Sequence, residues 1–186
     1  MIRRDQRRPT PTALLVGVVF LALACTRSDG TPSARRDAVP ASVDSIVLER
    51  SMCLGTCPAY RLRLSDSGEV RFESRNPGDE SRRVADTVPA ATFPALISKA
   101  KSIGFYDLPS KILGDSVLCR IARSDAPTVV ITIFTKVQTK QVQDYLGCSE
   151  TRAHETFQPL VRLRAFEVEI DSALGSSRWV RPASRR

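Results

Sequence analysis

The sequence contains few of the residues on which enzyme catalysis most often depends. One histidine, His154, occurs among its 186 residues. A zinc centre with three histidine ligands is therefore excluded, and any serine–histidine or cysteine–histidine mechanism would have to use His154, which stands in a polar stretch where we expect an exposed loop. Glycine-rich phosphate-binding loops and the Gly-x-Ser-x-Gly nucleophile motif are also missing. We therefore predict no catalytic residues, no metal site and no cofactor.

Long hydrophobic runs are missing as well. The apolar run at residues 14–24 has eleven residues, whereas a helix needs about 20 to span a bilayer. It follows a basic start at residues 1–8 and ends in small residues. Because this pattern is typical of a secretory signal, we interpret residues 1–24 as a signal peptide rather than a permanent transmembrane anchor.

The end of this signal, Leu21-Ala22-Leu23-Ala24-Cys25, resembles the lipobox of bacterial lipoproteins, although Leu and Ala are swapped relative to the commonest order. The resemblance implies that Cys25 is acylated, with palmitate among its acyl chains, and becomes the first mature residue. Thr26 is not the aspartate associated with inner-membrane retention, which implies the outer membrane, with the protein facing the periplasm. The alternative is an ordinary signal cut near Ala24, which would leave a free secreted protein.

The net charge of +8 comes from the two ends of the chain. Residues 44–177 carry 17 basic and 17 acidic side chains, whereas residues 178–186 carry four arginines and no acid. A nucleic-acid-binding protein concentrates its basic excess on the folded domain, so we predict no nucleic-acid partner. We interpret residues 183–186 as a solvated basic tail, with contact to anionic lipid headgroups as the alternative.

Residues 25–43 are rich in serine, proline and alanine and lack periodic hydrophobic residues. Such a composition cannot bury enough apolar surface to offset the entropy lost on ordering. We therefore predict a flexible tether with a root-mean-square reach of about 20–25 Å. Residues 44–182 then form a single domain, which is long enough for one hydrophobic core.

Hydrophobic periodicity in the first half of this domain predicts strands followed by a helix. The four predicted strands are residues 45–49, 60–64, 69–73 and 82–88. The second and third of these are joined by a Ser-Asp-Ser-Gly turn and give the strongest hairpin signal. Residues 92–104 follow a helical period, with Thr92 as the N-cap and Gly104 as the stop.

The second half repeats this arrangement. β-Branched residues predict strands at 128–135 and 140–146, and a helix is predicted from Pro159 to Gly175. Glu167 and Asp171 lie one turn apart on this helix, where we expect a solvated face. The order β-β-β-β-α-β-β-α favours an α+β fold with an antiparallel sheet and both helices packed on one face.

Four cysteines remain for the domain. Cys53 and Cys57 are separated by one residue more than a redox Cys-x-x-Cys motif, and a strand rather than a helix follows them. Zinc would need two close pairs, and Cys119 and Cys148 are 29 residues apart. Because an exported chain lies in an oxidising compartment, we predict two structural disulfides, with Gly55 allowing the tight turn. Pairing 53–57 and 119–148 is favoured, but four cysteines allow three connectivities and a redox-active 53–57 bridge is the alternative.

The segment Cys53-Leu54-Gly55-Thr56-Cys57-Pro58-Ala59-Tyr60 resembles the Cys-x-Gly-Thr-Cys-Pro-x-Tyr signature of a bacterial lipoprotein family that carries domain of unknown function 6438. The further segments that match are Ser45–Arg50, Phe105–Leu108, Ser124–Thr128, Ile170–Asp171 and Arg178–Trp179. Ser124 and the additional residues 149–155 depart from the family pattern. The resemblance implies an exported α+β domain and brings no established activity.

The candidate binding or motif residues are Gly55, Thr56, Pro58, Tyr60, Asp125 and Trp179. We interpret Trp179, just beyond the second helix, as a hydrophobic latch. Asp115 and Asp125 flank Cys119, where a carboxylate pair or calcium site is the alternative to turn roles. We favour turn roles because the loop lacks the alternating oxygen ligands of a calcium-binding loop.

These observations favour a non-catalytic domain at the cell envelope that binds a partner or acts as a structural accessory. Its partners would be the membrane, through the lipid on Cys25, and an unidentified envelope protein or glycan. One alternative is an inhibitor of an exported hydrolase. The other is a thiol–disulfide redox protein that uses Cys53 and Cys57. The oligomeric state is left open.

Overall fold

The computed structural model describes residues 44–149 and 158–181 of the chain. The signal peptide, Cys25, the tether, His154 and the basic tail all lie outside the described residues. No described helix is long and apolar enough to cross a membrane.

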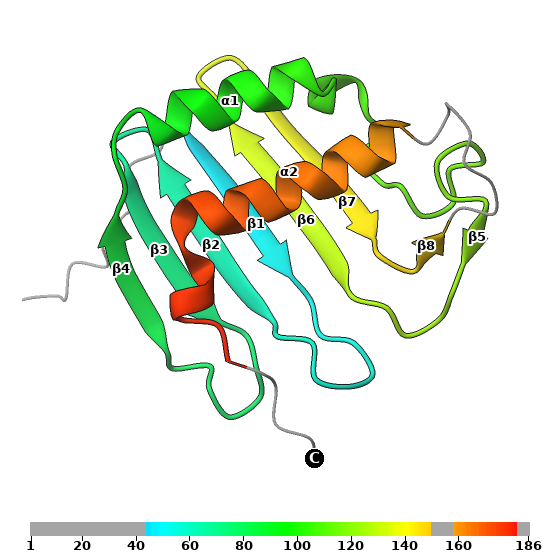
Figure 1. Cartoon of the computed structure of the whole chain (residues 1–186), viewed down its shortest axis with the longest axis horizontal. Coiled ribbons are helices and arrows are strands. Elements are labelled where there is room, and N and C mark those ends of the chain that lie inside the picture. The colour runs from blue at the N-terminus through cyan, green and yellow to red at the C-terminus, as the bar shows by residue number, and fades with distance from the viewer. Residues whose placement is uncertain (1–43, 150–157, 182–186) are drawn as a thin grey trace, which may run out of the picture. The chain divides into compact units, whose positions relative to one another are not determined.

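A six-stranded antiparallel sheet forms the centre of the domain (Figure 1). Its strands are β1 (Ser45–Arg50), β2 (Tyr60–Ser65), β3 (Glu69–Ser74), β4 (Arg83–Thr87), β6 (Thr128–Phe134) and β7 (Thr139–Tyr145). The spatial order is β4-β3-β2-β1-β6-β7. The strand β1, which the sequence shows only as a short apolar run, is therefore central and pairs on both sides with antiparallel neighbours.

Two α-helices accompany the sheet, α1 (Thr92–Ser102) and α2 (Gln158–Leu174), with the short 3-10 helices η1 (Phe105–Asp107) and η3 (Ser176–Arg178). Figure 1 shows both α-helices crossing the same side of the sheet. The buried apolar residues of both helices and of the sheet belong to one core cluster. The predicted α+β class and antiparallel sheet are confirmed.

Two short strands that the sequence analysis did not predict, β5 (Ile121–Ala122) and β8 (Cys148–Ser149), pair with each other apart from the main sheet. The disulfide Cys119–Cys148 joins β8, which contains Cys148, to the residues just before β5, and the second disulfide joins Cys53 to Cys57. Both predicted disulfides are therefore confirmed, with the favoured connectivity.

The β2–β3 hairpin follows directly from its alternating sequence. Leu62, Leu64, Val70 and Phe72 are buried in the core, while the residues between them face the other side. The turn requires glycine at position 68, where φ is +87° and a Cβ atom would lie 2.5 Å from the carbonyl oxygen of Val88. A side chain there would strain the backbone and displace Val88, the residue that follows β4.

The start of α1 differs from the prediction. Ala91 is the N-cap residue and no side chain caps the helix, so the assignment of Thr92 as N-cap was wrong. The backbone N–H of Thr92 donates to the carbonyl of Pro89 at 2.8 Å, and this turn takes the place of a side-chain cap. Gly104 and Gly175 follow the two helices with left-handed φ values of +74° and +66°, as expected for helix stops.

Candidate functional site

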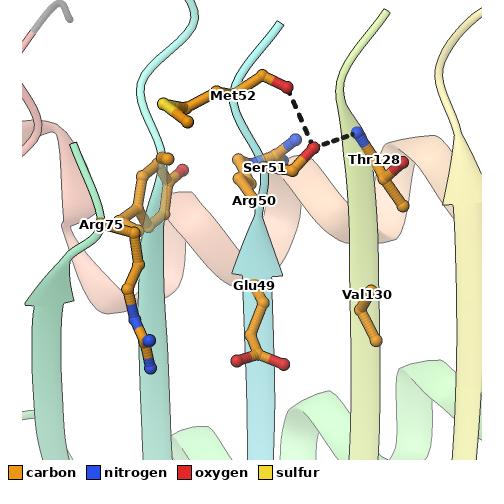
Figure 2. A pocket seen from close by; sticks show the side chains of 9 residues that line it. Glu49, Arg50, Ser51, Met52, Arg75, Thr128 and Val130 are labelled. Atoms are coloured by element: carbon orange, nitrogen blue, oxygen red, sulfur yellow. Dashed lines mark hydrogen bonds between the residues drawn. The ribbon is translucent and has the colours of Figure 1, made fainter. Parts of the chain in front are cut away.

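A shallow pocket of about 420 Å³ lies where β1, β2 and β6 meet the loop that contains the first disulfide. Its lining residues are Glu49, Arg50, Ser51, Met52, Ala59, Tyr60, Arg75, Thr128 and Val130. Figure 2 shows Glu49 and Val130 on one face of the sheet, with the helices passing behind it. The pocket therefore opens on the face that the two helices leave uncovered.

Backbone hydrogen bonds join two motif segments beside this pocket. The N–H of Ser51 donates to the carbonyl of Thr128 at 2.9 Å. The N–H of Thr128 donates to Ser51 Oγ at 2.8 Å (Figure 2). The N–H of Leu54 donates to the carbonyl of Asp125 at 3.4 Å. Segments about 70 residues apart in sequence thus form one rim.

The disulfide loop presents apolar side chains to solvent. Leu54 is 84% exposed and Met52 is 49% exposed. Gly55 has a φ of +145°, a conformation that favours glycine, and Thr56 is also exposed. Among the predicted site residues the structure therefore brings Gly55, Thr56 and Asp125 to one end of the sheet. Pro58 follows in the same loop and is half-buried.

Tyr60 and Trp179 have different surroundings. Tyr60 is buried, and its ring centre lies 5.7 Å from that of Phe72, which in turn lies 5.7 Å from that of Trp179. Trp179 packs against the core cluster and its carbonyl accepts a hydrogen bond from Arg82 Nη1 at 2.6 Å. The aromatic row fastens the segment after α2 to strands β2 and β3.

A polar cluster beneath the pocket, made of Arg50, Tyr60, Asp171 and Ser176, joins β1 and β2 to α2. Arg50 Nε and the Tyr60 hydroxyl donate to separate oxygens of Asp171, at 2.9 Å and 2.7 Å. The Ser176 hydroxyl donates to the second of these oxygens at 2.8 Å. Arg50 Nη2 lies 2.7 Å from Asp171 Oδ2. Asp171 is therefore a hydrogen-bonded anchor.

This cluster corrects the prediction that Glu167 and Asp171 face solvent. Glu167 is 3% exposed, and Asp171 is half-buried and ion-paired. Glu167 follows Leu163 by four positions and precedes Ile170 by three, so it belongs to the helical stripe that faces the sheet. The charge of Glu167 suggests a solvated face, but its spacing from Leu163 and Ile170 places it on the buried one.

Glu167 lies between two arginine–carboxylate pairs. Arg50 Nη1 is 4.0 Å from its carboxylate. On the other side Arg164 Nε donates to Asp144 Oδ2 at 2.8 Å, and Asp144 is only 1% exposed. Burial, followed by the negative charge of Asp144, raises the pKa of Glu167 from 4.5 to about 8. Near neutral pH the Glu167 carboxyl is therefore mostly protonated.

Tyr60 and Arg50 both keep their protons and therefore remain hydrogen-bond donors to Asp171. Burial, then the charge of Asp171, raises the pKa of the Tyr60 hydroxyl, which stays protonated and donates. Burial acts to lower the pKa of Arg50, but the charge of Asp171 and the hydrogen bond to it outweigh burial, and the net change is upward. Arg50 thus remains a cation. The hydrogen bonds from Arg50, Tyr60 and Ser176 all end on Asp171. This polar cluster therefore acts as a structural clamp between the sheet and α2.

The described part of the chain contains no group of three or more histidine, cysteine, aspartate or glutamate side chains placed to hold a metal ion. Asp115 accepts hydrogen bonds from the N–H groups of Val117 and Leu118, at 2.9 Å and 2.8 Å. These bonds are the turn role favoured for Asp115.

One family model matches the chain over most of the described domain. The family model described as Domain of unknown function (DUF6438) matches residues 44–164. The matched range contains the whole sheet, both disulfides and every pocket residue, and it ends within α2 before Glu167 and Asp171. A search of curated proteins found no match. Because the match covers more than half of the chain, the protein belongs to the family defined by the Domain of unknown function (DUF6438).

Proposed function

We propose that this protein is an envelope lipoprotein whose domain binds a segment of another envelope protein at the pocket beside the disulfide loop. The observation that carries the proposal is the position of this pocket. It lies on the sheet face that the helices leave open, and the Cys53–Cys57 loop and the Ser124–Thr128 segment border it. The signature motif proposed for the family would then mark a binding rim.

The chemistry of the pocket favours a peptide over a glycan. Sugar rings commonly stack on exposed aromatic faces, which carry apolar area and π electrons. Tyr60 is the aromatic residue among those lining the pocket, and it is 5% exposed with its hydroxyl bound to Asp171. Met52 and Val130 provide apolar contact. Arg50 is bound to Asp171, whereas Glu49 and Arg75 belong to exposed ion pairs that can also contact a charged partner of either sign. A peptide segment with mixed side chains matches this combination.

The disulfide loop is suited to binding because it is already constrained. Its ends are joined by the Cys53–Cys57 bridge, and the N–H of Leu54 is bonded to the Asp125 carbonyl. Ordering a loop on association costs free energy, and a loop that is constrained beforehand avoids much of this cost. The exposed Leu54 and Met52 can therefore contact a partner with little loss of conformational entropy.

Lipid anchoring at Cys25 completes the proposal. Its support is the lipobox-like sequence of residues 21–25 and the two disulfides of the domain, because such bonds persist in exported proteins and are rare in the cytosol. The pairs Arg50–Asp171 and Arg164–Asp144 tie the charged groups of α2 to the sheet as part of the scaffold, which is why we favour binding over catalysis.

Site-specific photo-crosslinking in the envelope tests this function. A crosslinking side chain at Leu54 should trap a discrete protein, whereas one at Val168, which is 64% exposed on α2, should not. Val130→Arg should block the pocket and reduce the Leu54 crosslink, while Gln141→Arg on the exposed β7 surface serves as the matched control. Crosslinks to lipid alone, or equal yields from Leu54 and Val168, would contradict the proposal.

A second candidate function is inhibition of an exported hydrolase. The observation in its favour is the exposed apolar side chain of Leu54 at 84% within a disulfide-closed loop, because such loops can enter an active-site cleft without being ordered first. Excess protein should then reduce the activity of an envelope hydrolase, and Leu54→Asp should abolish the effect. Unchanged activity across the hydrolases of the envelope would count against this candidate.

A further inference from the structure

The chain enters the domain at the end of the sheet opposite the pocket. Strand β1 begins at Ser45, which lies opposite Phe134 of β6 in the sheet register. The preceding residue, Asp44, accepts a hydrogen bond from the N–H of Asp66 in the β2–β3 turn at 2.9 Å. Figure 1 shows the β6–β7 turn at this end, while the loop between β1 and β2 lies at the other end.

The β6–β7 turn presents apolar side chains on a well-defined backbone. The N–H and the hydroxyl of Thr135 both donate to the carbonyl of Gln138 at 2.9 Å, and the N–H of Gln138 donates to Thr135 Oγ1 at 3.1 Å. Between these residues Val137 is 90% exposed, and Phe134 at the end of β6 is 38% exposed. The turn therefore keeps apolar side chains exposed to water on a hydrogen-bonded backbone.

We propose that the β6–β7 turn contacts the lipid surface to which the protein is anchored, so that the pocket faces away from the membrane. This inference rests on the proposed acylation of Cys25. Eighteen residues separate Cys25 from Asp44, and the flexible tether predicted from their composition would have a root-mean-square reach of about 20–25 Å. The six residues of β1 span about 20 Å. Because the tether joins the domain at Asp44, the end at which the chain enters is on average nearer the bilayer than the pocket end, which lies one strand length away.

The contact is apolar rather than electrostatic. Lys136 is exposed in the turn and can reach a headgroup phosphate, but Asp44 and Asp66 lie at the same end and offset its charge. The free energy falls when the apolar side chains of Val137 and Phe134 leave water for the membrane interface. A contact of this size is weak without the lipid anchor, and salt should not displace it.

Tryptophan fluorescence tests the orientation in the full-length acylated protein, incorporated into vesicles of phosphatidylethanolamine and phosphatidylglycerol. Val137→Trp should emit at shorter wavelength in vesicles than in detergent-free buffer and should be quenched by brominated lipid. Leu54→Trp is the matched control, since Leu54 is 84% exposed at the opposite end, and it should show neither change. The native Trp179 contributes the same background to both variants.

Each outcome supports or overturns the proposal. Quenching of the Leu54→Trp variant would place the pocket end on the membrane and overturn the proposal. No response from either variant would show that neither end contacts the lipid, which also overturns it. Measuring the intact mass of the same sample separates this proposal from lipid anchoring. If Cys25 is acylated but the fluorescence of Val137→Trp shows the side chain in water, the proposed lipid contact of the turn is refuted and lipid anchoring at Cys25 is supported. If Cys25 is not acylated, anchoring is wrong, and the response of Val137→Trp to added vesicles decides the contact by itself.

Discussion

Replacing Glu167 by glutamine should make the stability of the protein much less dependent on pH. The Glu167 side chain is 3% exposed and lies between the Arg50–Asp171 and Arg164–Asp144 pairs. Burial and the charge of Asp144 raise its pKa from 4.5 to about 8. Glutamine has the same shape as the protonated acid and cannot ionise, so Glu167→Gln keeps the packing and removes the titration.

The sign and size of the effect follow from the change in pKa. Below pH 4.5 the Glu167 carboxyl is protonated in both the folded and the unfolded chain, and the folded state has its full advantage. As the pH rises from 4.5 to about 8, the unfolded chain loses this proton while the folded chain keeps it, so the free energy of unfolding falls. One pKa unit corresponds to about 1.4 kcal/mol, so the loss amounts to roughly 5 kcal/mol.

Urea denaturation of the two proteins at a series of pH values is the assay. The difference in unfolding free energy between Glu167→Gln and wild type should be small near pH 4 and should grow steadily in favour of the variant up to about pH 8. Glu169→Gln is the control: Glu169 is exposed and pairs with Lys99 at 3.6 Å, so its loss should cost less than about 1 kcal/mol. Parallel pH curves for Glu167→Gln and wild type would refute the reasoning.

Three further predictions concern the clamp and the disulfides. Asp171→Asn leaves the half-buried Arg50 without the carboxylate that pairs with it and should lower the unfolding free energy by about 2–3 kcal/mol. Ser176→Ala removes one hydrogen bond and should cost about 1 kcal/mol. Chemical denaturation measures both free energies, and equal costs would contradict the central position of Asp171. Replacing the Cys119–Cys148 pair by serines opens a loop with a sequence separation of 29 and should cost about 3–4 kcal/mol, compared with about 2 kcal/mol for Cys53–Cys57; the reverse order in thermal denaturation would be inconsistent with loop-closure entropy. A structural Cys53–Cys57 bridge should have a reduction potential below about −300 mV in a glutathione or dithiothreitol titration, and a distinctly higher potential would favour thiol redox activity.

Local sequence patterns were sufficient to predict most of the strands and the ends of both helices. Alternation along β2 and β3 identifies the residues that the structure buries, such as Leu62 and Phe72. Gly104 and Gly175 stop the helices at the predicted positions because both adopt left-handed backbone angles. The two-residue strands β5 and β8 were missed because so short a segment has no periodicity to detect.

The polar cluster could not be predicted in the same way. Arg50 and Asp171 are 121 residues apart, and a charged residue within one helix gives no indication of a partner on a distant strand. The spacing of Glu167 relative to Leu163 and Ile170 did contain a signal, because it places a carboxyl on the buried stripe. A buried carboxyl at such a position is a reason to look for an arginine elsewhere in the core.

The pocket depends on contacts between distant segments of the chain. Its rim forms because β6, although late in the sequence, pairs directly with β1, which brings Thr128 to Ser51. The signature loop and the Ser124–Thr128 segment were both recognised in the sequence, but their meeting depends on this strand order. Sequence periodicity identifies strands and does not determine which distant strands pair.

The intact mass of protein purified from membranes, measured with and without reductant, tests the central claim most directly, namely that this is a lipid-anchored domain held by two disulfides. The account predicts a chain that begins at Cys25, carries added acyl mass, and gains about 4 Da when the bridges Cys53–Cys57 and Cys119–Cys148 are reduced. A chain without acyl mass, or one whose mass does not change on reduction, would contradict it.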